Sequence, residues 1–228
     1  MDLTHLALKL YAYLKQKGIN FNDEGYPIFS REMLLNDAPK YVLPIGHTSV
    51  KDKKNALLVF FSNDQNIYKR LLRLEQDLSF YKQFYGVSGF DLSPRINWNV
   101  RLQKFNILLS MMATAYLAVN GIKVMPNFRT GCIQTLPVLN CYPANSTYIA
   151  GTIGCSRGYI DINEMHLRFK LILSNPRQLI FYGTLKEQYS KLLKEFGIKH
   201  KCYLDFNRYS RKWGSTKWQT QKQIIQDW

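Results

Sequence analysis

Hydrophobic and polar positions along the chain form blocks with two different periods. Near the start, Leu3, Leu6, Leu10 and Leu14 recur every three or four residues ahead of Gly18, which predicts an amphipathic helix that ends there. Beyond residue 40, short runs rich in β-branched and aromatic residues predict strands, and stretches with helical spacing lie between them. The predicted strands are residues 41–45, 56–61, 87–90, 122–126, 148–153, 179–182 and 202–206. The predicted helices between them are residues 64–81, 97–119, 160–173 and 185–196.

This alternation of strands and helices predicts the fold class. Repeated βα units are typical of an α/β protein with a mainly parallel sheet, because consecutive parallel strands need a helical crossover. The sheet is expected to be barrel-like or open; a doubly wound sheet fits the same pattern, and we favour the barrel-like form. We expect one domain over 1–228, with an N-terminal helical extension at 1–40, a βα core at 41–206 and a basic, aromatic C-terminal tail at 207–228. Residues 130–145 lack a clear period, which predicts an extended connection.

The positive charge of the chain bears on its partner. Lys and Arg total 31 against 16 Asp and Glu, which gives a formal net charge of +15. Such an excess repels itself in a compact protein, whereas neutralising the phosphates of a nucleic acid releases condensed counterions. DNA or RNA is therefore the expected partner, with an anionic membrane surface or a role in solubility alone as alternatives. The hydrophobic content of 46% excludes a disordered chain.

Cysteine usage and the N-terminal segment bear on the compartment. The N-terminal apolar stretch follows Asp2 and contains Lys9, which is unlike a signal peptide, and no uninterrupted apolar run reaches the length of a membrane span. Four cysteines are present, with no CxxC pair and no common zinc spacing: Cys132, Cys141, Cys155 and Cys202. We therefore expect reduced thiols, a cytoplasmic location and no membrane partner.

The tail interleaves cations with aromatic residues, a pattern typical of nucleic-acid binding. Basic groups contact phosphates, and aromatic rings stack on unpaired bases. The alternative is a tail whose tryptophans dock into the body and leave the lysines solvated. The predicted nucleic-acid-binding residues are Lys199, Lys201, Arg208, Tyr209, Arg211, Lys212, Trp213, Lys217 and Trp218.

Polar residues follow several predicted strands, where ligands gather in α/β folds. Asp64 and Asp91 are the candidate catalytic carboxylates, because two converging acids share a proton or hold a divalent metal such as magnesium. The alternative is that each only caps a helix or forms a turn. A second candidate is an anion-binding turn, with a tight strand-to-helix turn as its alternative. Its residues are Gly151, Gly154, Ser156 and Arg157.

Four segments of the middle of the chain carry a family resemblance. They are residues 89–93 (GFDLS), 114–116 with 121–126 (TAY, GIKVMP), 148–154 (YIAGTIG) and 180–183 (IFYG). On these segments the chain resembles a family of phage and mobile-element proteins known only as domain of unknown function 4417. The resemblance implies an aspartate–serine pair after one strand and a glycine turn after another. It departs at 108–112, which is apolar where an arginine-bearing, aromatic-rich helix is expected, and at Thr130, where a tryptophan is expected.

These observations leave three functional hypotheses open. The leading one is a nucleic-acid-binding protein of a phage or plasmid, acting in replication, mobilisation or its regulation. The first alternative is a small enzyme or ligand-binding module with a phosphate-bearing ligand at the strand ends. The second is an anti-defence protein that binds a host protein. Whether the chain is an enzyme, and its oligomeric state, stay open at this point.

Overall fold

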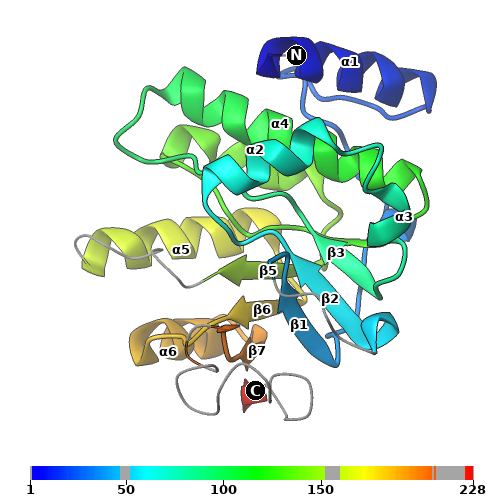
Figure 1. Cartoon of the computed structure of the whole chain (residues 1–228). Coiled ribbons are helices and arrows are strands. Elements are labelled where there is room, and N and C mark those ends of the chain that lie inside the picture. Colours follow the sequence, from blue (N-terminus) through cyan, green and yellow to red (C-terminus); the bar gives the residue numbers. More distant parts are fainter. Residues whose placement is uncertain (1, 47–51, 152–159, 207, 209–223, 228) are drawn as a thin grey trace.

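The computed structural model describes residues 2–46, 52–151, 160–206, 208 and 224–227 (Figure 1). Its strands form two four-stranded sheets in which neighbours follow chain order. The first sheet is parallel throughout, and the second is parallel except for its last pair, β7 and β8. The first contains β1 (Tyr41–Pro44), β2 (Ala56–Val59), β3 (Gly86–Ser88) and β4 (Val124–Met125). The second contains β5 (Thr147–Gly151), β6 (Gln178–Tyr182), β7 (Lys199–Tyr203) and β8 (Ile224–Asp227).

The two sheets are joined by a short parallel bridge between Asn127 and Ile149. The Phe128 N–H donates to the Ile149 carbonyl at 2.7 Å, and the Ile149 N–H donates to the Pro126 carbonyl at 2.9 Å. Strands β1 to β7 therefore follow one another in chain order, which is the strand order of a βα barrel. The predicted α/β class, with mainly parallel strands and an N-terminal helix, is confirmed.

Two hydrogen bonds link the second sheet to the residues that lead into the first sheet. The Tyr203 hydroxyl on β7 donates to the Pro39 carbonyl just before β1, and the Thr147 hydroxyl on β5 donates to the Asn36 carbonyl at 2.7 Å. These hydrogen bonds hold the start of the first sheet against the second, as expected of a barrel-like arrangement.

Helices cover the sheets, as Figure 1 shows, with α1 (Leu3–Gln16) lying on α4 (Val100–Val119). Asp2 caps α1 by accepting from the His5 N–H, and Leu6, Leu10 and Leu14 form its buried face. Helix α4 is apolar on most sides and long enough by composition to cross a membrane, but 72% of that stretch is buried among its neighbours. Burial on this scale is the environment of a core helix.

The remaining helices depart from the predicted pattern in two places. The predicted helix at 64–81 is divided into α2 (Asp64–Leu72) and α3 (Leu78–Tyr81), with Asp77 between them bound to Arg70 and Arg73. The connection at 130–145 is not extended but contains the 3₁₀ helix η3 (Ile133–Cys141). Its apolar residues recur every three positions, the period of a 3₁₀ helix. The other helices are η1 (Arg31–Met33), η2 (Lys53–Asn55), α5 (Ile160–Ser174) and α6 (Glu187–Glu195).

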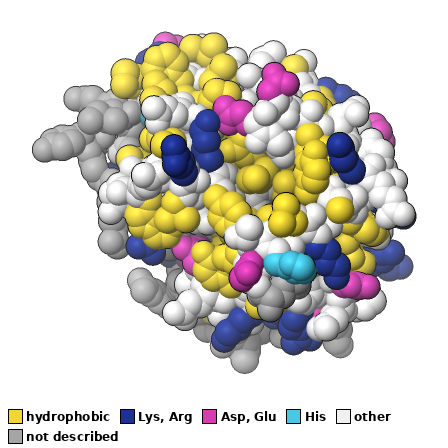
Figure 2. Space-filling view, turned by 90° about the horizontal axis from the view of Figure 1, so that it is seen from above, with side chains coloured by type: hydrophobic (Ala, Val, Ile, Leu, Met, Phe, Trp, Pro, Cys, Tyr) yellow, Lys and Arg dark blue, Asp and Glu magenta, His cyan; other side chains and the backbone are white. Residues whose placement is uncertain are grey.

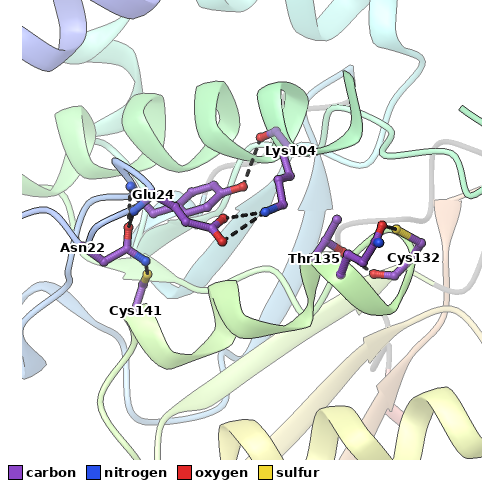
Figure 3. Close-up of polar contacts among 8 residues, drawn as sticks. Asn22, Glu24, Lys104, Cys132, Thr135 and Cys141 are labelled. Carbon is purple, nitrogen blue, oxygen red and sulfur yellow. Dashed lines mark hydrogen bonds and ion pairs between the residues drawn. The ribbon is translucent and has the colours of Figure 1, made fainter. Parts of the chain in front are cut away.

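Polar contacts hold the segment after α1 against α4 and η3 (Figure 3). Lys104 on α4 forms an ion pair with Glu24 at 2.9 Å, and Asn22 donates to the Cys141 sulfur at 3.5 Å. The described cysteines are not in a disulfide: Cys132, Cys141 and Cys202. A hydrophobic core cluster that runs from Leu6 to Leu204 includes both sheets and the helices around them.

One face of the molecule is chemically mixed. Figure 2 shows hydrophobic side chains over a broad area of it, with Lys and Arg side chains spread around them. The helices α1, α2 and α4 each expose a leucine, namely Leu8, Leu72 and Leu102. The excess positive charge is therefore not gathered into one block on this face.

Candidate functional site

The carboxyl ends of β3 and β4 meet at a small cavity of about 30 Å³. Because the strands are parallel, the residues that follow them lie at one edge of the sheet, where ligands gather in α/β folds. A cavity of this volume has room for water, and its lining mixes polar and apolar side chains on both the strand side and the helix side. The lining residues that matter below are Gly89, Asp91, Ser110, Thr114, Asn127 and Arg129.

Asp91 is the central charge of this site. Its side chain is 5% exposed, and both carboxylate oxygens are engaged. Asn127 donates to Oδ1 at 2.8 Å, and the Arg129 guanidinium donates to Oδ2 at 2.7 Å. Burial raises the pKa of Asp91 more than Arg129 and Asn127 lower it, and the negative charge of Asp64 raises it further. Asp91 is therefore a buried acid held by one arginine and one amide.

Asp64 is linked to the loop that carries Asp91 by a hydrogen bond from Ser93. The Asp64 Oδ1 accepts from the Ser93 N–H at 3.0 Å, while Arg129 extends its second amino group to the Ser93 hydroxyl at 3.4 Å. Asp64 does not cap α2: Asn63 is the N-cap and accepts from the Asn66 N–H. The structure thus brings both predicted carboxylates to the loop after β3, one on each side of Ser93.

This arrangement provides an ion pair and offers few ligands to a metal. Both oxygens of Asp91 are already paired, and hard cations need several free oxygen ligands. Within the part of the chain that the structure describes, no group of three His, Cys, Asp or Glu side chains is placed to hold a metal ion. The described residues add no third metal-binding side chain to Asp64 and Asp91. Magnesium binding by these two carboxylates therefore stays a prediction.

Two hydroxyl groups on α4 hold the backbone on either side of Asp91. The Phe90 N–H donates to the Thr114 hydroxyl at 3.0 Å, and the Leu92 N–H donates to the Ser110 hydroxyl at 3.2 Å. Both hydroxyls are buried in the mainly apolar middle of the helix. Their spacing of four residues on one helix face is the sequence signal for this role, and the sequence analysis did not use it.

Asn127, like Arg129, is a residue of this site that was not among the predicted site residues. Its amide nitrogen binds Asp91, while its Oδ1 is buried and has no hydrogen-bond partner among the described residues. A buried polar atom without a partner costs free energy, so such an atom in a cavity wall marks a place for water or a ligand donor. Gly89 packs closely against Asn127. A Cβ added at Gly89 would lie 3.1 Å from the backbone nitrogen of Asn127.

The predicted anion-binding turn is described only at its first residue. Gly151 ends β5 and packs against the Phe61 ring, where an added Cβ would lie 3.1 Å from the ring. Close packing therefore accounts for a glycine at this position. Gly154, Ser156 and Arg157 lie outside the described residues.

The predicted nucleic-acid-binding residues also lie partly inside and partly outside the described residues. Lys199 and Lys201 lie on β7, between β6 and β8 in the sheet, with Lys199 exposed and Lys201 half-buried. Arg208 forms an ion pair at 3.4 Å with Asp205, which is buried. The end of the tail, Ile224–Asp227, pairs with β7 as the antiparallel strand β8. The other six lie outside the described residues: Tyr209, Arg211, Lys212, Trp213, Lys217 and Trp218.

Comparison with known proteins places the chain in a family. Residues 27–200, more than half of the chain, match the family described as Domain of unknown function (DUF4417). The match contains the whole cavity and the strands that build it. No curated protein and no solved structure gave a significant match. The chain therefore belongs to the DUF4417 family.

Proposed function

We propose that this protein binds nucleic acid through phosphate contacts made by its excess cations. The single observation that carries the proposal is the charge balance. If each of the 16 acids neutralised one of the 31 Lys and Arg residues, 31 − 16 = 15 positive charges would remain. A polyanion with condensed counterions gains free energy by pairing with such an excess, because the counterions are released.

The placement of the acids supports this reading. Three buried acids, Asp77, Asp91 and Asp205, each lie beside an arginine within the fold. These three carboxylates are buried and paired, so they add no exposed negative charge that would repel a polyanion. Arg129 is the clearest case, because its guanidinium binds the buried carboxylate of Asp91.

The distribution of acids along the chain points to one region. No Asp or Glu occurs among the 69 residues of 92–160, whereas six cations do. This acid-free segment forms the loop after β3, helix α4, strand β4, helix η3 and strand β5. The strand-end edge around the cavity is thus built largely from chain that adds positive charge and no negative charge, which favours a phosphate backbone there.

A phage or plasmid setting, with a role in replication, mobilisation or its regulation, belongs to the same proposal. It rests on the family resemblance and on the charge. Binding of either DNA or RNA agrees with phosphate contacts, because these contacts carry no sequence information.

The experiment that tests the proposal is fluorescence anisotropy of the full chain with labelled single-stranded and double-stranded DNA and RNA over a salt series. Phosphate binding requires that log K falls linearly with log salt, with a slope of about 0.7 to 0.9 per contact. An absence of binding at low salt would overturn the proposal. A salt-independent affinity would also contradict it, because phosphate neutralisation would then not be the source of binding.

A second candidate is a phosphate-bearing small ligand at the strand-end cavity. The unpartnered Asn127 Oδ1 in the cavity wall favours it, since a ligand hydroxyl or amine would donate there. Arg129 would grip the anion once Asp91 takes up a proton. Thermal-shift assays with inorganic phosphate and nucleotides check this: stabilisation that vanishes in R129M supports the site, and equal stabilisation in R129M contradicts it.

A further inference from the structure

The loop between β3 and α4 combines an aromatic ring with exposed cations at the strand-end edge. We infer that Trp98, with Arg95 and Arg101 beside it, is the stacking site for an unpaired base of single-stranded nucleic acid. This inference rests on the proposed function and names the ligand class and the residues for it. None of these three residues belongs to the predicted tail.

The geometry of the loop brings a ring and a planar cation together. The Arg95 guanidinium lies 5.1 Å from the centroid of the Trp98 ring. Arg95 is exposed and Trp98 is half-buried, so both side chains are within reach of a ligand in solvent. Unpaired bases stack on tryptophan rings and on arginine guanidinium planes, whereas the bases of a duplex are already stacked on one another.

A buried side chain on α4 holds the part of the loop that carries Trp98. Gln103 is 1% exposed, and its amide nitrogen donates to the carbonyls of Trp98 at 2.8 Å and Ile96 at 3.3 Å. Its amide oxygen accepts from the Cys132 N–H at 2.7 Å, which ties the loop to the start of η3. A loop backbone held in this way loses less conformational entropy when a base stacks on the Trp98 ring.

Gly131 leaves the space that the Gln103 side chain occupies. A Cβ at Gly131 would lie 2.0 Å from the Gln103 amide oxygen and 3.1 Å from the Pro94 carbonyl. Only glycine lets the two loops approach this closely. Pro94 itself lines the cavity, so the loop lies next to the Asp91–Arg129 site.

The charges of the loop are available to phosphates. Arg95 and Arg101 are both exposed, and neither forms an ion pair with a described residue. They lie in the acid-free segment 92–160, and Arg101 is in the first turn of α4, where the helix dipole adds positive potential. Two phosphates that flank a stacked base would each meet one arginine.

The test compares four variants of the full chain, using labelled oligodeoxythymidylate and oligouridylate with a duplex as reference. W98A should weaken single-strand binding about tenfold, the loss expected for one stacked base, while W98F should retain most of the affinity. R95A/R101A should lower the salt slope by about 1.4, which is two contacts of about 0.7 each. The control K9A/K82A removes two exposed cations from other surfaces and should leave that slope unchanged.

The outcomes separate this inference from the proposed function. If the wild-type chain binds and W98A binds equally tightly with an unchanged circular dichroism spectrum, the stacking site is wrong while the proposed function stands. If R95A/R101A and K9A/K82A lower the slope equally, the phosphate contacts are spread over the surface and the loop has no special part. If the wild-type chain does not bind at all, both fall. Because Arg95 and Arg101 are exposed, their replacement reports on binding even if W98A folds poorly.

Discussion

The Arg129 guanidinium donates to the Asp91 carboxylate at 2.7 Å and thereby joins the end of β4 to the end of β3. This contact places a cation from one strand on the buried anion of its neighbour. It is a charge-assisted hydrogen bond across the candidate site, and its carboxylate is buried.

Replacing Arg129 with methionine should destabilise the fold in a pH-dependent way. The variant leaves the buried Asp91 carboxylate without its cation, which costs about 3 kcal/mol at neutral pH. The pKa of Asp91 is already raised by burial and rises further without Arg129. As the pH falls through that pKa, the carboxyl becomes neutral, so the stability difference from wild type should shrink.

Urea unfolding at neutral and acidic pH measures this difference. Arg168→Met is the matched control, because Arg168 forms half-exposed ion pairs with Glu164 and Glu195 on the surface. Surface pairs contribute about 0 to 1 kcal/mol. A loss in R129M that is equally large at low pH would show that Arg129 acts through packing instead of charge.

Replacing Gln103 with leucine should loosen the loop after β3. Three backbone groups, at Ile96, Trp98 and Cys132, lose their partner in the variant. A group that water cannot reach costs about 1 to 3 kcal/mol when it is left unsatisfied. We expect a lower unfolding free energy and faster amide exchange at Cys132. Unchanged exchange at that N–H would mean that Gln103 does not fix the loop.

Gly131→Ala tests the same contact from the other side. The added methyl would lie 2.0 Å from the Gln103 amide oxygen, so the side chain must move and its hydrogen bond to Cys132 must lengthen or break. The variant should be destabilised in the same direction as Q103L, and the double variant should lose less than the sum because both act on one contact. Gly25→Ala is a control with open space around the Cβ but the strain of a positive φ.

His166 should make the protein sensitive to mild acid. Burial on α5 and, to a lesser extent, the charge of Lys170 together lower the pKa of His166 to about 4. The unfolded chain has a histidine pKa of about 6.5, so it takes up the proton first as the pH falls. The stability that neutral His166 contributes is therefore present above about pH 6.5 and is lost as the pH falls towards 4.

His166→Gln removes this proton uptake. The unfolding free energy of wild type relative to the variant should decrease between about pH 7 and pH 5, which denaturant titrations at each pH measure. A constant difference across that range would show that His166 has the same pKa in the folded and unfolded chain.

Neutralising the tail cations tests whether phosphate contacts extend beyond the loop. The variant R211Q/K212Q/K217Q/K222Q retains Ile224–Asp227, so the pairing of β8 with β7 is kept. If all four cations contact phosphates of a single strand, the salt slope should fall by about 2.8. An unchanged slope would remove the tail from the nucleic-acid surface while leaving the Trp98 loop as a separate question.

Local patterns in the sequence predicted most of the elements but not their limits. The buried leucines of α1 and the apolar runs of β1 and β2 were clear, because each pattern reports burial on one face or on both. The 3₁₀ helix at Ile133–Cys141 was predicted as extended chain, because a period of three was not considered. The predicted helix at 64–81 divides at Asp77, where two arginines of other turns bind one buried carboxylate.

The sequence by itself determined the βα alternation, the family and the large positive charge, because these depend on residue type and local spacing. It also named Asp64 and Asp91 as strand-end acids. Only the tertiary structure decided that Asn127 and Arg129 bind Asp91, that Asp64 reaches it through Ser93, and that Gln103 fixes the Trp98 loop. These contacts join residues from separate strands and helices, and the distances between such residues are set by how the sheets and α4 pack, which no local pattern records.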